Sequence, residues 1–548
     1  MQYTKSKIQT PGSLLSHLKG HEEIRLTKND TPENMNAFDY FFEHTSNLEK
    51  LFLAGREEIS YKDLYNSCTE IAGWLVKTVG QNKNIIVLSA NNLFLTKVYL
   101  AVIKSGNICI PLDPGIETEN FRYIHDLTKP DLIFLTHDVE RRLGLNSDIG
   151  IFPDTLQEAI NGDPEALAHQ SPAGENGNRK EAKPGVAQIS GTVSDALSSG
   201  FDIERCAEII FTSGSTGEPK GVMISHKNLI ANTSSIVEYL ELKEDDRMLV
   251  VLPFYYCYGL SLLHTHLRVG GSIVFNNSFI FLGGVIKSLL DYKCTGFAGV
   301  PTHFQVLLRK SDSFKTTSFP DLRYVTQAGG KLAPVFIDEF IEAHPDIRFV
   351  VMYGQTEATA RLSWLPPELW ESRKGSMGKG VPGVELRVVN EKGELIRPGE
   401  TGEVIARGDN IMMGYYADEE GTKKTIRDGW LYTGDLGTVD EEGYIYLTAR
   451  SKEIIKVRGK RISPKEIEAV ILSLPDVIDC TVEGIEDEIE GEKLKATVII
   501  RKDPAQEITS DFLIEYCSGR LELFKVPQIY DIKEELTISS TGKKIKKV

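Results

Sequence analysis

The sequence lacks the features that define several common classes of protein. Its seven cysteines are scattered along 548 residues, and no two of them have CxxC spacing. This arrangement disfavours a disulfide framework and a zinc site, and it indicates a reducing compartment. No apolar run is as long as a membrane-spanning helix, and no charged-then-apolar signal opens the chain. We therefore expect a cytoplasmic protein without a membrane span.

The sequence also contains fewer basic than acidic residues. Lysine and arginine together number 62, against 78 aspartate and glutamate residues, so the net charge is -16. A general nucleic-acid binder needs a positive face to neutralise phosphates. We therefore expect no nucleic-acid partner, although this balance is compatible with a local positive site for a small anion.

Strand-like and helix-like segments alternate through much of the chain. Residues 84–90 (NIIVLSA) and 108–113 (ICIPLD) are apolar runs typical of buried strands. Asn91 or Asn92 is placed to cap the helix between them. A second alternating region extends over residues 208–359. This pattern predicts an α/β fold with parallel sheets.

The pattern changes twice further along the chain. From Gly378 to Thr448, short strands alternate with glycine-rich turns, which indicates a small β-rich subdomain. A helix then starts near Ser463, with Pro464 at its first position and Glu466 placed to complete a capping box. This helix belongs to a small α+β unit near the C-terminus.

These changes divide the chain into segments. We expect residues 1–35 to be a loosely ordered polar leader, because they lack sustained periodicity. Residues 36–450 form the main body. Within it, residues 161–200 are rich in glycine, serine, proline and charge, and predict a surface loop or insertion. Residues 451–548 form the C-terminal domain.

One glycine-rich segment, residues 211–222 (FTSGSTGEPKGV), points to chemistry rather than packing. Its glycines allow close backbone approach to a ligand, its hydroxyl groups are hydrogen-bond donors, and Lys220 adds a mobile positive charge. The segment therefore suits a polyphosphate. It is not a Walker A loop, because Pro219 stands where that pattern needs glycine. An exposed linker is the alternative, and the strand-like residues that precede the segment disfavour it.

This segment resembles the signature loop of the adenylate-forming superfamily, which contains acyl-CoA and aryl-CoA synthetases, adenylation domains of peptide synthetases, and luciferases. Further segments resemble the superfamily's other motifs in order: residues 353–359 (YGQTEAT), 402–416 (GEVIARGDNIMMGYY), 428–437 (DGWLYTGDLG), 449–468 (ARSKEIIKVRGKRISPKEIE) and 541–547 (TGKKIKK). The resemblance covers roughly residues 35–548. It implies a large N-terminal domain of two parallel α/β subdomains plus a small β-barrel-like subdomain, and a small mobile C-terminal α+β domain.

The resemblance also implies a reaction in two steps. A carboxylate first attacks the α-phosphate of ATP, and pyrophosphate leaves. A thiol then attacks the acyl-adenylate, and AMP leaves. The implied cofactors are ATP, Mg²⁺ and CoA, or the phosphopantetheine of an acyl carrier protein.

Residues that hold the nucleotide follow from the motifs that match. The resemblance assigns the phosphates to Thr212, Ser213, Gly214, Ser215, Thr216, Gly217 and Lys220. It also implies that Thr356 contacts phosphate and that Glu357 binds Mg²⁺. It assigns adenine to Tyr353, the ribose hydroxyls to Asp435, and close backbone approach to adenine and substrate to Gly329 and Gly330. Arg450 is assigned to ribose or phosphate, and Lys456 is a further cationic candidate. A carboxylate such as Asp435 can accept both ribose hydroxyls. The ordinary alternatives are a core aromatic at Tyr353, a turn residue at Asp435 and a solvated lysine at Lys456.

The C-terminal motifs imply a domain that moves between the two steps. Lys543 is the predicted catalytic residue of the first step, and the alternative is a basic, solvated tail. Lys452 occupies the hinge position. Gly443 and Gly459 are assigned to the channel for the thiol.

The acid itself is expected to contact residues near 252–266 (LPFYYCYGLSLLHTH) and the later motifs. The predicted pocket consists of Tyr256, Tyr258, Val300, Phe304 and Met352. Residues 252–266 contain no acidic side chain to hold the ammonium group of an amino acid. We therefore expect a carboxylic acid other than an amino acid.

Three other interpretations compete with an acyl-CoA ligase. A relative with the same first step could load an acyl carrier protein instead of CoA. A catalytically retired binding protein is disfavoured by the intact set of Lys220, Glu357, Asp435 and Lys543. A P-loop kinase is disfavoured by the missing Walker pattern. We expect a monomer or a homodimer.

Overall fold

The computed structural model describes residues 34–145, 150–162, 200–212, 218–457, 459–487 and 491–535. All of them belong to one unit, Glu33–Val548. Most of the predicted leader and most of the predicted insertion at 161–200 lie outside the described residues. None of the described helices is long and apolar enough to cross a bilayer.

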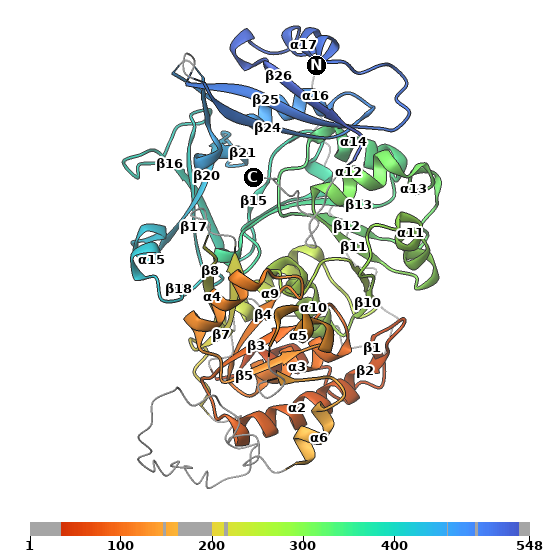
Figure 1. The fold of residues 1–548 in the computed structure, drawn as a ribbon, viewed down its shortest axis with the longest axis vertical. Helices are drawn as coiled ribbons and strands as arrows, with labels where there is room; N and C mark the ends of the chain where they lie inside the picture. Colours follow the sequence, from red (N-terminus) through yellow and green to blue (C-terminus); the bar gives the residue numbers. More distant parts are fainter. Residues whose placement is uncertain are drawn as a thin grey trace, which may run out of the picture. The chain divides into compact units, whose positions relative to one another are not determined.

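One sheet is built mainly from the first third of the chain (Figure 1). Its strand order is β18-β8-β7-β4-β3-β5-β6, and the pairs among β3, β4, β5, β6 and β7 are parallel. The strands are β3 (Asn84–Leu88), β4 (Ile108–Leu112), β5 (Leu132–Leu135), β6 (Gly150–Ile151), β7 (Cys206–Thr212), β8 (Lys220–Ser225) and β18 (Gly414–Tyr415). The predicted strands at 84–90 and 108–113 are confirmed.

A second sheet has the order β15-β14-β13-β12-β11-β9-β10-β1-β2. Its central strands are parallel, and antiparallel strands lie at both edges. The strands are β1 (Leu51–Leu53), β2 (Ile59–Ser60), β9 (Arg247–Val250), β10 (Ser272–Phe275), β11 (Gly296–Gly299), β12 (Tyr324–Gln327), β13 (Arg348–Tyr353), β14 (Ser363–Leu365) and β15 (Lys379–Gly380). The predicted pair of parallel α/β subdomains is therefore present.

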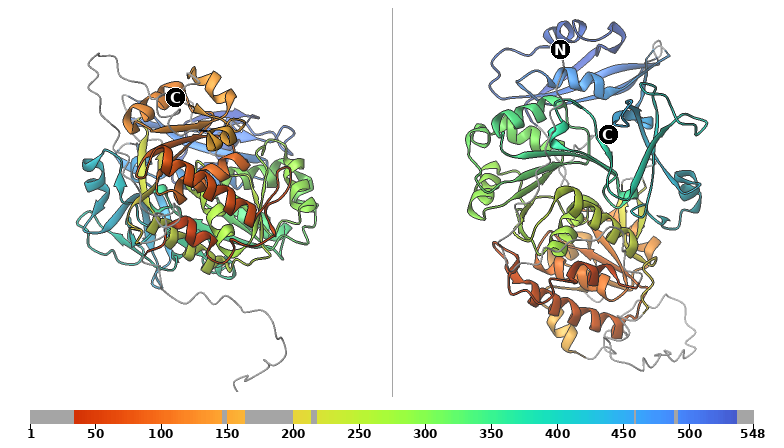
Figure 2. Two further views of the ribbon diagram at one scale, coloured as in Figure 1. Left: turned by 90° about the horizontal axis from the view of Figure 1, so that it is seen from below. Right: turned by 180° about the vertical axis from the view of Figure 1, so that it is seen from behind.

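Helices cover both sheets, as Figures 1 and 2 show. The helices of the first part of the chain are α1 (Ala37–Phe42), which precedes the first strand, α2 (Tyr61–Thr78), α3 (Leu93–Lys104), α4 (Thr118–Thr128), α5 (His137–Leu143) and α6 (Leu156–Asn161). Those that follow the later strands are α9 (His226–Leu240), α10 (Cys257–Val269), α11 (Leu282–Asp291), α12 (Pro301–Lys310), α13 (Asp312–Thr316) and α14 (Pro334–Ala343). Asn92 caps α3 by accepting a hydrogen bond from the backbone N–H of Leu95, as predicted.

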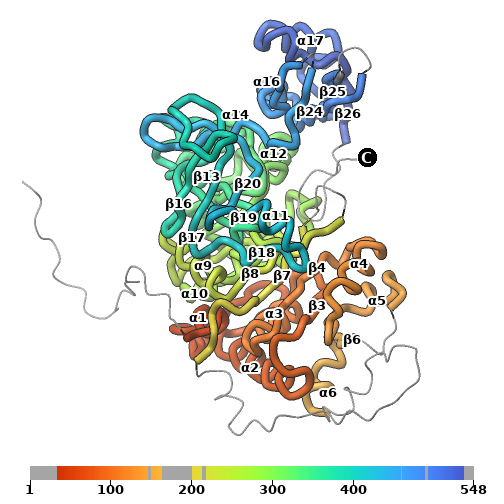
Figure 3. Tube along the Cα trace, turned by 90° about the vertical axis from the view of Figure 1, so that its left-hand side faces the viewer, coloured from red at the N-terminus to blue at the C-terminus, as the bar shows by residue number. Residues whose placement is uncertain are grey.

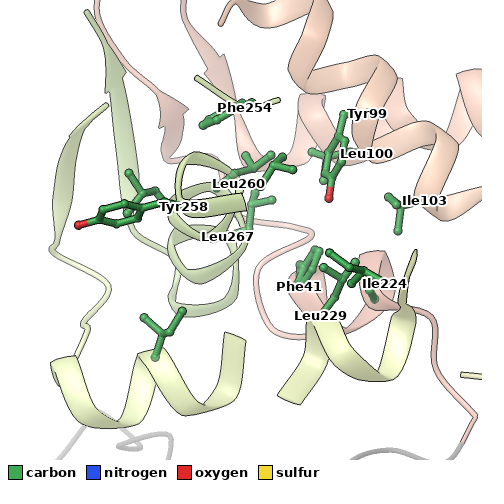
Figure 4. Packing of buried hydrophobic residues seen from close by; sticks show 14 of the residues in the cluster. Phe41, Tyr99, Leu100, Ile103, Ile224, Leu229, Phe254, Tyr258, Leu260 and Leu267 are labelled. Carbon is green, nitrogen blue, oxygen red and sulfur yellow. The ribbon is translucent and has the colours of Figure 1, made fainter. Parts of the chain in front are cut away.

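The alternation of side chains along each strand creates separate cores on the two faces of each sheet. On β13, Val350 and Met352 join the large core that α9 and α10 share with the first sheet. The alternate positions, Phe349 and Val351, pack with the core under α12 and α14. Figure 4 shows part of the large core, in which Tyr258 and Tyr99 lie on opposite sides of α10.

A third, antiparallel sheet forms the predicted β-rich subdomain. It contains β16 (Val384–Val389), β17 (Gly402–Gly408), β19 (Ile426–Arg427), β20 (Trp430–Val439) and β21 (Ile445–Arg450). The helix α15 (Glu419–Thr425) belongs to the same stretch of chain. One short strand of this stretch, β18, leaves the third sheet and pairs with β8 of the first, as Figure 3 shows. This pairing joins two motifs that are far apart in the sequence.

The chain after Arg450 forms the predicted α+β unit. Its sheet has β22 (Ile455–Val457), β23 (Lys460–Ile462), β24 (Val477–Asp487), β25 (Gly491–Ile500) and β26 (Ile529–Lys533), with helices α16 (Pro464–Leu472) and α17 (Ser510–Ser518). Ser463 is the N-cap of α16 and Pro464 its first residue, as predicted. The predicted capping box is wrong: the hydroxyl of Ser463 donates a hydrogen bond to the carbonyl oxygen of Thr448 (2.6 Å) instead.

Candidate active site

The predicted site residues gather where strands of the two sheets end. Thr212 is the last residue of β7, and Tyr353 is the last residue of β13. Val300 follows β11 directly, and Gly329 follows β12. Ligands of open α/β sheets bind beyond the carboxyl ends of parallel strands. The topology therefore places a binding site at these strand ends.

The part of the site predicted to bind phosphates contains two residues that the sequence analysis did not name. The pairing of β18 with β8 brings Tyr415 and Asp418 to Lys220. The Lys220 ammonium lies 2.7 Å from Asp418 Oδ2 and 4.8 Å from the centroid of the Tyr415 ring. The hydroxyl of Tyr415 donates a hydrogen bond to Glu357 Oε1 (2.8 Å). Burial and the neighbouring Glu357 raise the pKa of Tyr415 well above its ordinary value, so it stays a donor.

The carboxylate of Glu357 fits the magnesium ion expected there. Glu357 is half-buried in a short 3₁₀ segment (Thr356–Ala358), and its side chain accepts only the bond from Tyr415 among those recorded in the described residues. The described residues contain no cluster of three or more metal-ligating side chains. Mg²⁺ in phosphoryl-transfer sites is usually held by one or two carboxylates together with substrate phosphates. A single carboxylate, bonded to the tyrosine whose ring lies against Lys220, meets that requirement.

The part of the site predicted to bind ribose is built around a buried carboxylate. Asp435, on β20, is 4% exposed, and its Oδ2 accepts a 2.6 Å hydrogen bond from the Tyr353 hydroxyl. Its Oδ1 accepts a 3.0 Å bond from Arg450 Nε, and the two residues are cross-strand partners of β20 and β21. Burial, and then Asp435, raise the pKa of Tyr353 well above its ordinary value. The structure thus brings together three residues that the sequence assigned to the nucleotide.

A glycine and two side chains form one wall of the predicted acyl site. Gly329 has φ +82°, and a Cβ atom there would lie 2.8 Å from Tyr256 Oη and 3.0 Å from Val300 Cγ1. Both the backbone conformation and the close contacts require glycine at this position. Gly330 follows it in the same loop. Burial raises the pKa of Tyr256 above its ordinary value, so its hydroxyl also stays protonated.

Tyr258 and Met352 lie deeper in the large core. The hydroxyl of Tyr258 lies 2.7 Å from Thr326 Oγ1 and donates to the carbonyl oxygen of that residue (3.0 Å). The ring of Tyr258 packs edge-on against that of Tyr256, with 6.5 Å between the centroids. Met352 Sδ accepts hydrogen bonds from Tyr239 Oη (2.9 Å) and Arg361 Nε (3.3 Å).

Phe304 lies apart from these residues. It belongs to the core on the other face of the second sheet, where its ring contacts those of Phe297, Phe340 and Phe349. Met352, in contrast, points into the large core. A position in an apolar helix does not reveal which face of a sheet it covers, because both faces of a buried sheet are apolar.

The residues assigned to the hinge and the thiol channel lie on exposed connections. Lys452 is in a short 3₁₀ segment (Ser451–Glu453) that follows β21, and Lys456 is exposed on β22. Gly443 (φ +87°) and Gly459 (φ +77°) occupy turns with no atom within 4 Å of an added Cβ. Their predicted roles stay predictions.

Part of the predicted site falls outside the described residues. Lys543 and the glycine-rich segment are in this group, the latter comprising Ser213, Gly214, Ser215, Thr216 and Gly217. At the described ends of that segment, Thr212 and Lys220 are cross-strand partners of β7 and β8.

Comparisons with known proteins agree with this geometry. A family model described as AMP-binding enzyme matches residues 40–416, and one described as AMP-binding enzyme C-terminal domain matches residues 466–543. The oxalate–CoA ligase of Arabidopsis thaliana is 30% identical over 498 residues, which cover 90% of this chain and 93% of that protein. The long-chain-fatty-acid–CoA ligase of Salmonella typhimurium is 32% identical over 344 residues, 62% of this chain and 60% of that protein. The structure of ATP-bound MatB from Rhodopseudomonas palustris has a TM-score of 0.77 and 25% identity, and covers 93% of this chain and 97% of its own.

The chain therefore belongs to the AMP-binding enzyme family, within the adenylate-forming superfamily. It is an AMP-forming acyl-CoA ligase. The predicted superfamily and the predicted fold class are confirmed, whereas the domain boundaries and the roles of individual residues stay predictions.

Proposed function

We propose that this enzyme activates a carboxylic acid other than an amino acid with Mg-ATP and transfers the acyl group to CoA. In the first step, a carboxylate oxygen attacks the α-phosphorus, the bond to the β-phosphate bridging oxygen breaks, and pyrophosphate leaves with the bond electrons. In the second step, the CoA sulfur attacks the acyl carbon and displaces AMP.

The observation that supports this proposal is that two clusters of polar and charged residues lie near the ends of β7 and β13. Lys220, Glu357 and Tyr415 form one group, and Tyr353, Asp435 and Arg450 form the other. Both are linked through β13 and the 3₁₀ segment that follows it. The first group supplies a cation and a metal-binding carboxylate, and the second supplies a buried acceptor for hydroxyl groups.

Each group matches one part of Mg-ATP. Lys220 and Thr356 bind the phosphates, and Glu357 holds Mg²⁺, which neutralises charge on the leaving pyrophosphate when it is bound. Asp435 uses its remaining lone pairs to accept hydroxyl groups of the ribose, because an ionised carboxylate has about four acceptor positions. Arg450 orients that carboxylate through its hydrogen bond to Oδ1.

Lys543 supplies the positive charge that brings the acid to the α-phosphate. Two anions repel each other in the first step, so a cation between them lowers the barrier. The second step needs no such cation, because the thiol meets a mixed anhydride. Movement of residues 451–548 about Lys452 would withdraw Lys543 between the two steps.

The test is pyrophosphate release from Mg-ATP with a panel of short, long and aryl carboxylic acids and amino acids, with and without CoA. We expect release with particular non-amino acids, and acyl-CoA only when CoA is present. Adenylate formation without transfer to CoA would move the acceptor to a carrier protein. If no acid of the panel caused pyrophosphate release, the proposed activity would be overturned.

A variant at Lys543 separates the two steps. We expect Lys543→Ala to abolish adenylate formation and to leave thioester formation from supplied acyl-AMP largely unchanged. Equal loss of both steps would contradict the assigned role. Lys544→Ala, one residue away, is the matched control for a general effect of charge near the C-terminus.

A further inference from the structure

Arg361 is a buried cation that has no acidic partner among the residues that the structure describes. Three arginines are buried in the part of the chain that the structure describes: Arg268 (7% exposed), Arg309 (2%) and Arg361 (2%). Arg268 pairs with Glu43, and Arg309 pairs with Glu339. No aspartate or glutamate among the described residues forms an ion pair with Arg361, although it is as buried as Arg309. The buried Lys104 also has a carboxylate partner, Asp39.

The acceptors around Arg361 are neutral and distant. Its Nε reaches Met352 Sδ at 3.3 Å, one terminal nitrogen reaches its neighbour's carbonyl oxygen (Ala360) at 3.3 Å, and the other reaches Ser261 Oγ at 3.5 Å. Hydrogen bonds from arginine to carboxylates are normally about 2.7–2.9 Å long. A thioether sulfur is only a weak acceptor. Burial of a guanidinium with such partners is costly unless another charge compensates it.

The backbone on both sides of Arg361 is held in place. Its N–H donates to Asn232 Oδ1 (3.2 Å), and its carbonyl oxygen accepts from Asn410 Nδ2 (2.6 Å). Two residues earlier, Thr359 has φ +60° and donates its hydroxyl hydrogen to the Asn410 carbonyl oxygen (2.7 Å). A non-glycine residue in this left-handed conformation is uncommon and often marks a functional site. The guanidinium is therefore positioned before any ligand arrives.

The place of Arg361 ties it to the acid rather than to ATP. Its guanidinium lies 4.1 Å from the centroid of the Tyr258 ring, and its Nε meets Met352. Both residues belong to the predicted acyl site. Among the described residues, Arg361 makes no hydrogen bond or ion pair with Lys220, Glu357 or Asp435. An anion that pairs with Arg361 would therefore come with the acyl part of the substrate.

We propose that Arg361 recognises a second carboxylate, so that the substrate is a dicarboxylic acid. This inference rests on the proposed function, and it names the substrate class. One carboxylate of the acid reacts with ATP, and the other pairs with the guanidinium. Met352 Sδ now receives hydrogen bonds from both Arg361 and Tyr239, so it marks the point at which two donors converge. A flexible methionine side chain can turn aside and leave that point to a carboxylate oxygen.

The test compares acids in matched pairs, in which a methyl group replaces the second carboxylate. Suitable pairs are succinate with butyrate, adipate with hexanoate, and isophthalate with 3-methylbenzoate. The readouts are pyrophosphate release and acyl-CoA formation, expressed as kcat/KM. We expect the wild-type enzyme to favour the dicarboxylic acid of at least one pair by about 100-fold, because the monoacid leaves a buried cation unpaired.

Variants at Arg361 assign that preference to the guanidinium. Arg361→Gln should reduce kcat/KM for the preferred diacid on the order of 100-fold, mainly through KM, and should change the value for the matched monoacid less than about threefold. Arg361→Lys keeps the charge without the planar fork, and should retain part of the preference. The second variant keeps the test valid if Arg361→Gln folds poorly.

Arg268→Gln is the matched control. Arg268 is also buried, and its guanidinium also packs on a tyrosine ring, 4.1 Å from the centroid of Tyr40. Its charge is already paired with Glu43, so its loss should lower stability and leave the preference for the diacid unchanged.

Two outcomes would overturn the inference. Turnover of each monoacid at least as fast as its paired diacid would remove the role of Arg361 and leave the proposed ligase activity intact. Pyrophosphate release with none of these acids would count against both.

Discussion

The hydroxyl of Tyr353 and the carboxylate of Asp435 form a 2.6 Å hydrogen bond across 82 residues of sequence. The bond joins the end of β13 in the second sheet to β20 in the third sheet. Arg450 holds the other oxygen of the same carboxylate. Asp435 is thereby fixed in one orientation, with lone pairs left for the ribose hydroxyls that we propose it accepts.

Loss of the Asp435 charge should weaken the binding of ATP. Asp435→Asn removes an ionised acceptor and presents an N–H₂ group to a neighbour that is itself a donor. We expect the KM for ATP to rise roughly 10- to 100-fold, as measured by pyrophosphate release at saturating acid. Tyr353→Phe removes one donor and leaves the charge, so its effect should be below about tenfold. An unchanged KM in Asp435→Asn would place the ribose elsewhere.

The ion pair of Lys220 and Asp418 should compete with ATP. The two side chains are 2.7 Å apart and about one-third exposed, so Lys220 must share or leave Asp418 when it binds phosphate. The hydrogen bond from Lys220 lowers the pKa of Asp418, which keeps that carboxylate ionised at neutral pH. We expect Asp418→Asn to lower the KM for ATP by up to about fivefold, the usual range for exposed pairs.

Asparagine suits this test because Asp418 also caps α15 by accepting from the Gly421 N–H (2.7 Å), and asparagine can do the same. Lys220→Ala should raise the KM for ATP in the same titration. A higher KM in Asp418→Asn would mean that Asp418 positions Lys220 for the phosphate instead of competing for it.

A methyl group at Gly329 should damage the acid site more than the fold. Gly329→Ala carries the cost of a positive φ, about 1 kcal/mol, and it also brings a Cβ to within 2.8 Å of Tyr256 Oη. We expect kcat/KM for the acid to fall at least about tenfold. The double variant Gly329→Ala/Tyr256→Phe removes the clashing oxygen and should recover part of that loss.

Gly399→Ala provides the comparison for backbone strain alone. Gly399 has φ +86° and no atom within 4 Å of an added Cβ. Its substitution should cost a similar amount of stability and leave kcat/KM unchanged. Equal kinetic losses in the two alanine variants would mean that contact with Tyr256 is unimportant.

Glu208 should make the stability of the enzyme depend on pH. This carboxyl group is 1% exposed on β7 and accepts a 2.7 Å hydrogen bond from Tyr99 Oη. Burial raises its pKa from 4.5 to about 7. An unfolded glutamate ionises above about pH 4.5, so folding is penalised increasingly as the pH rises from about 4.5 to 7. The full penalty, roughly 3 kcal/mol, applies above pH 7.

Glu208→Gln removes the ionisation but keeps an acceptor for Tyr99. Urea midpoints at pH 5 and pH 8 should therefore differ less in this variant than in the wild type, with the gain in stability confined to the higher pH. The exposed Glu368→Gln serves as the control. Parallel pH dependences of Glu208→Gln and the wild type would show that another group carries the effect.

Local signals in the sequence were sufficient for the class of fold and for naming candidate residues of the nucleotide site. Apolar runs mark the parallel strands, because a strand buried on both faces is apolar throughout. Asn92 caps its helix through an interaction three residues away. Residues such as Tyr353, Glu357 and Asp435 were found because they stand in short motifs whose order along the chain resembles that of one superfamily.

The sequence by itself determined these features because each depends on neighbouring residues or on the order of short segments. The tertiary structure alone decided which distant side chains meet. Tyr415 and Asp418 reach Lys220 because β18 pairs with β8. Phe304 and Met352 are both buried, yet the second sheet separates them. No local pattern shows whether a buried arginine has a carboxylate partner, since that depends on packing between elements far apart in the chain, and this is why Arg361 became visible only in the folded protein.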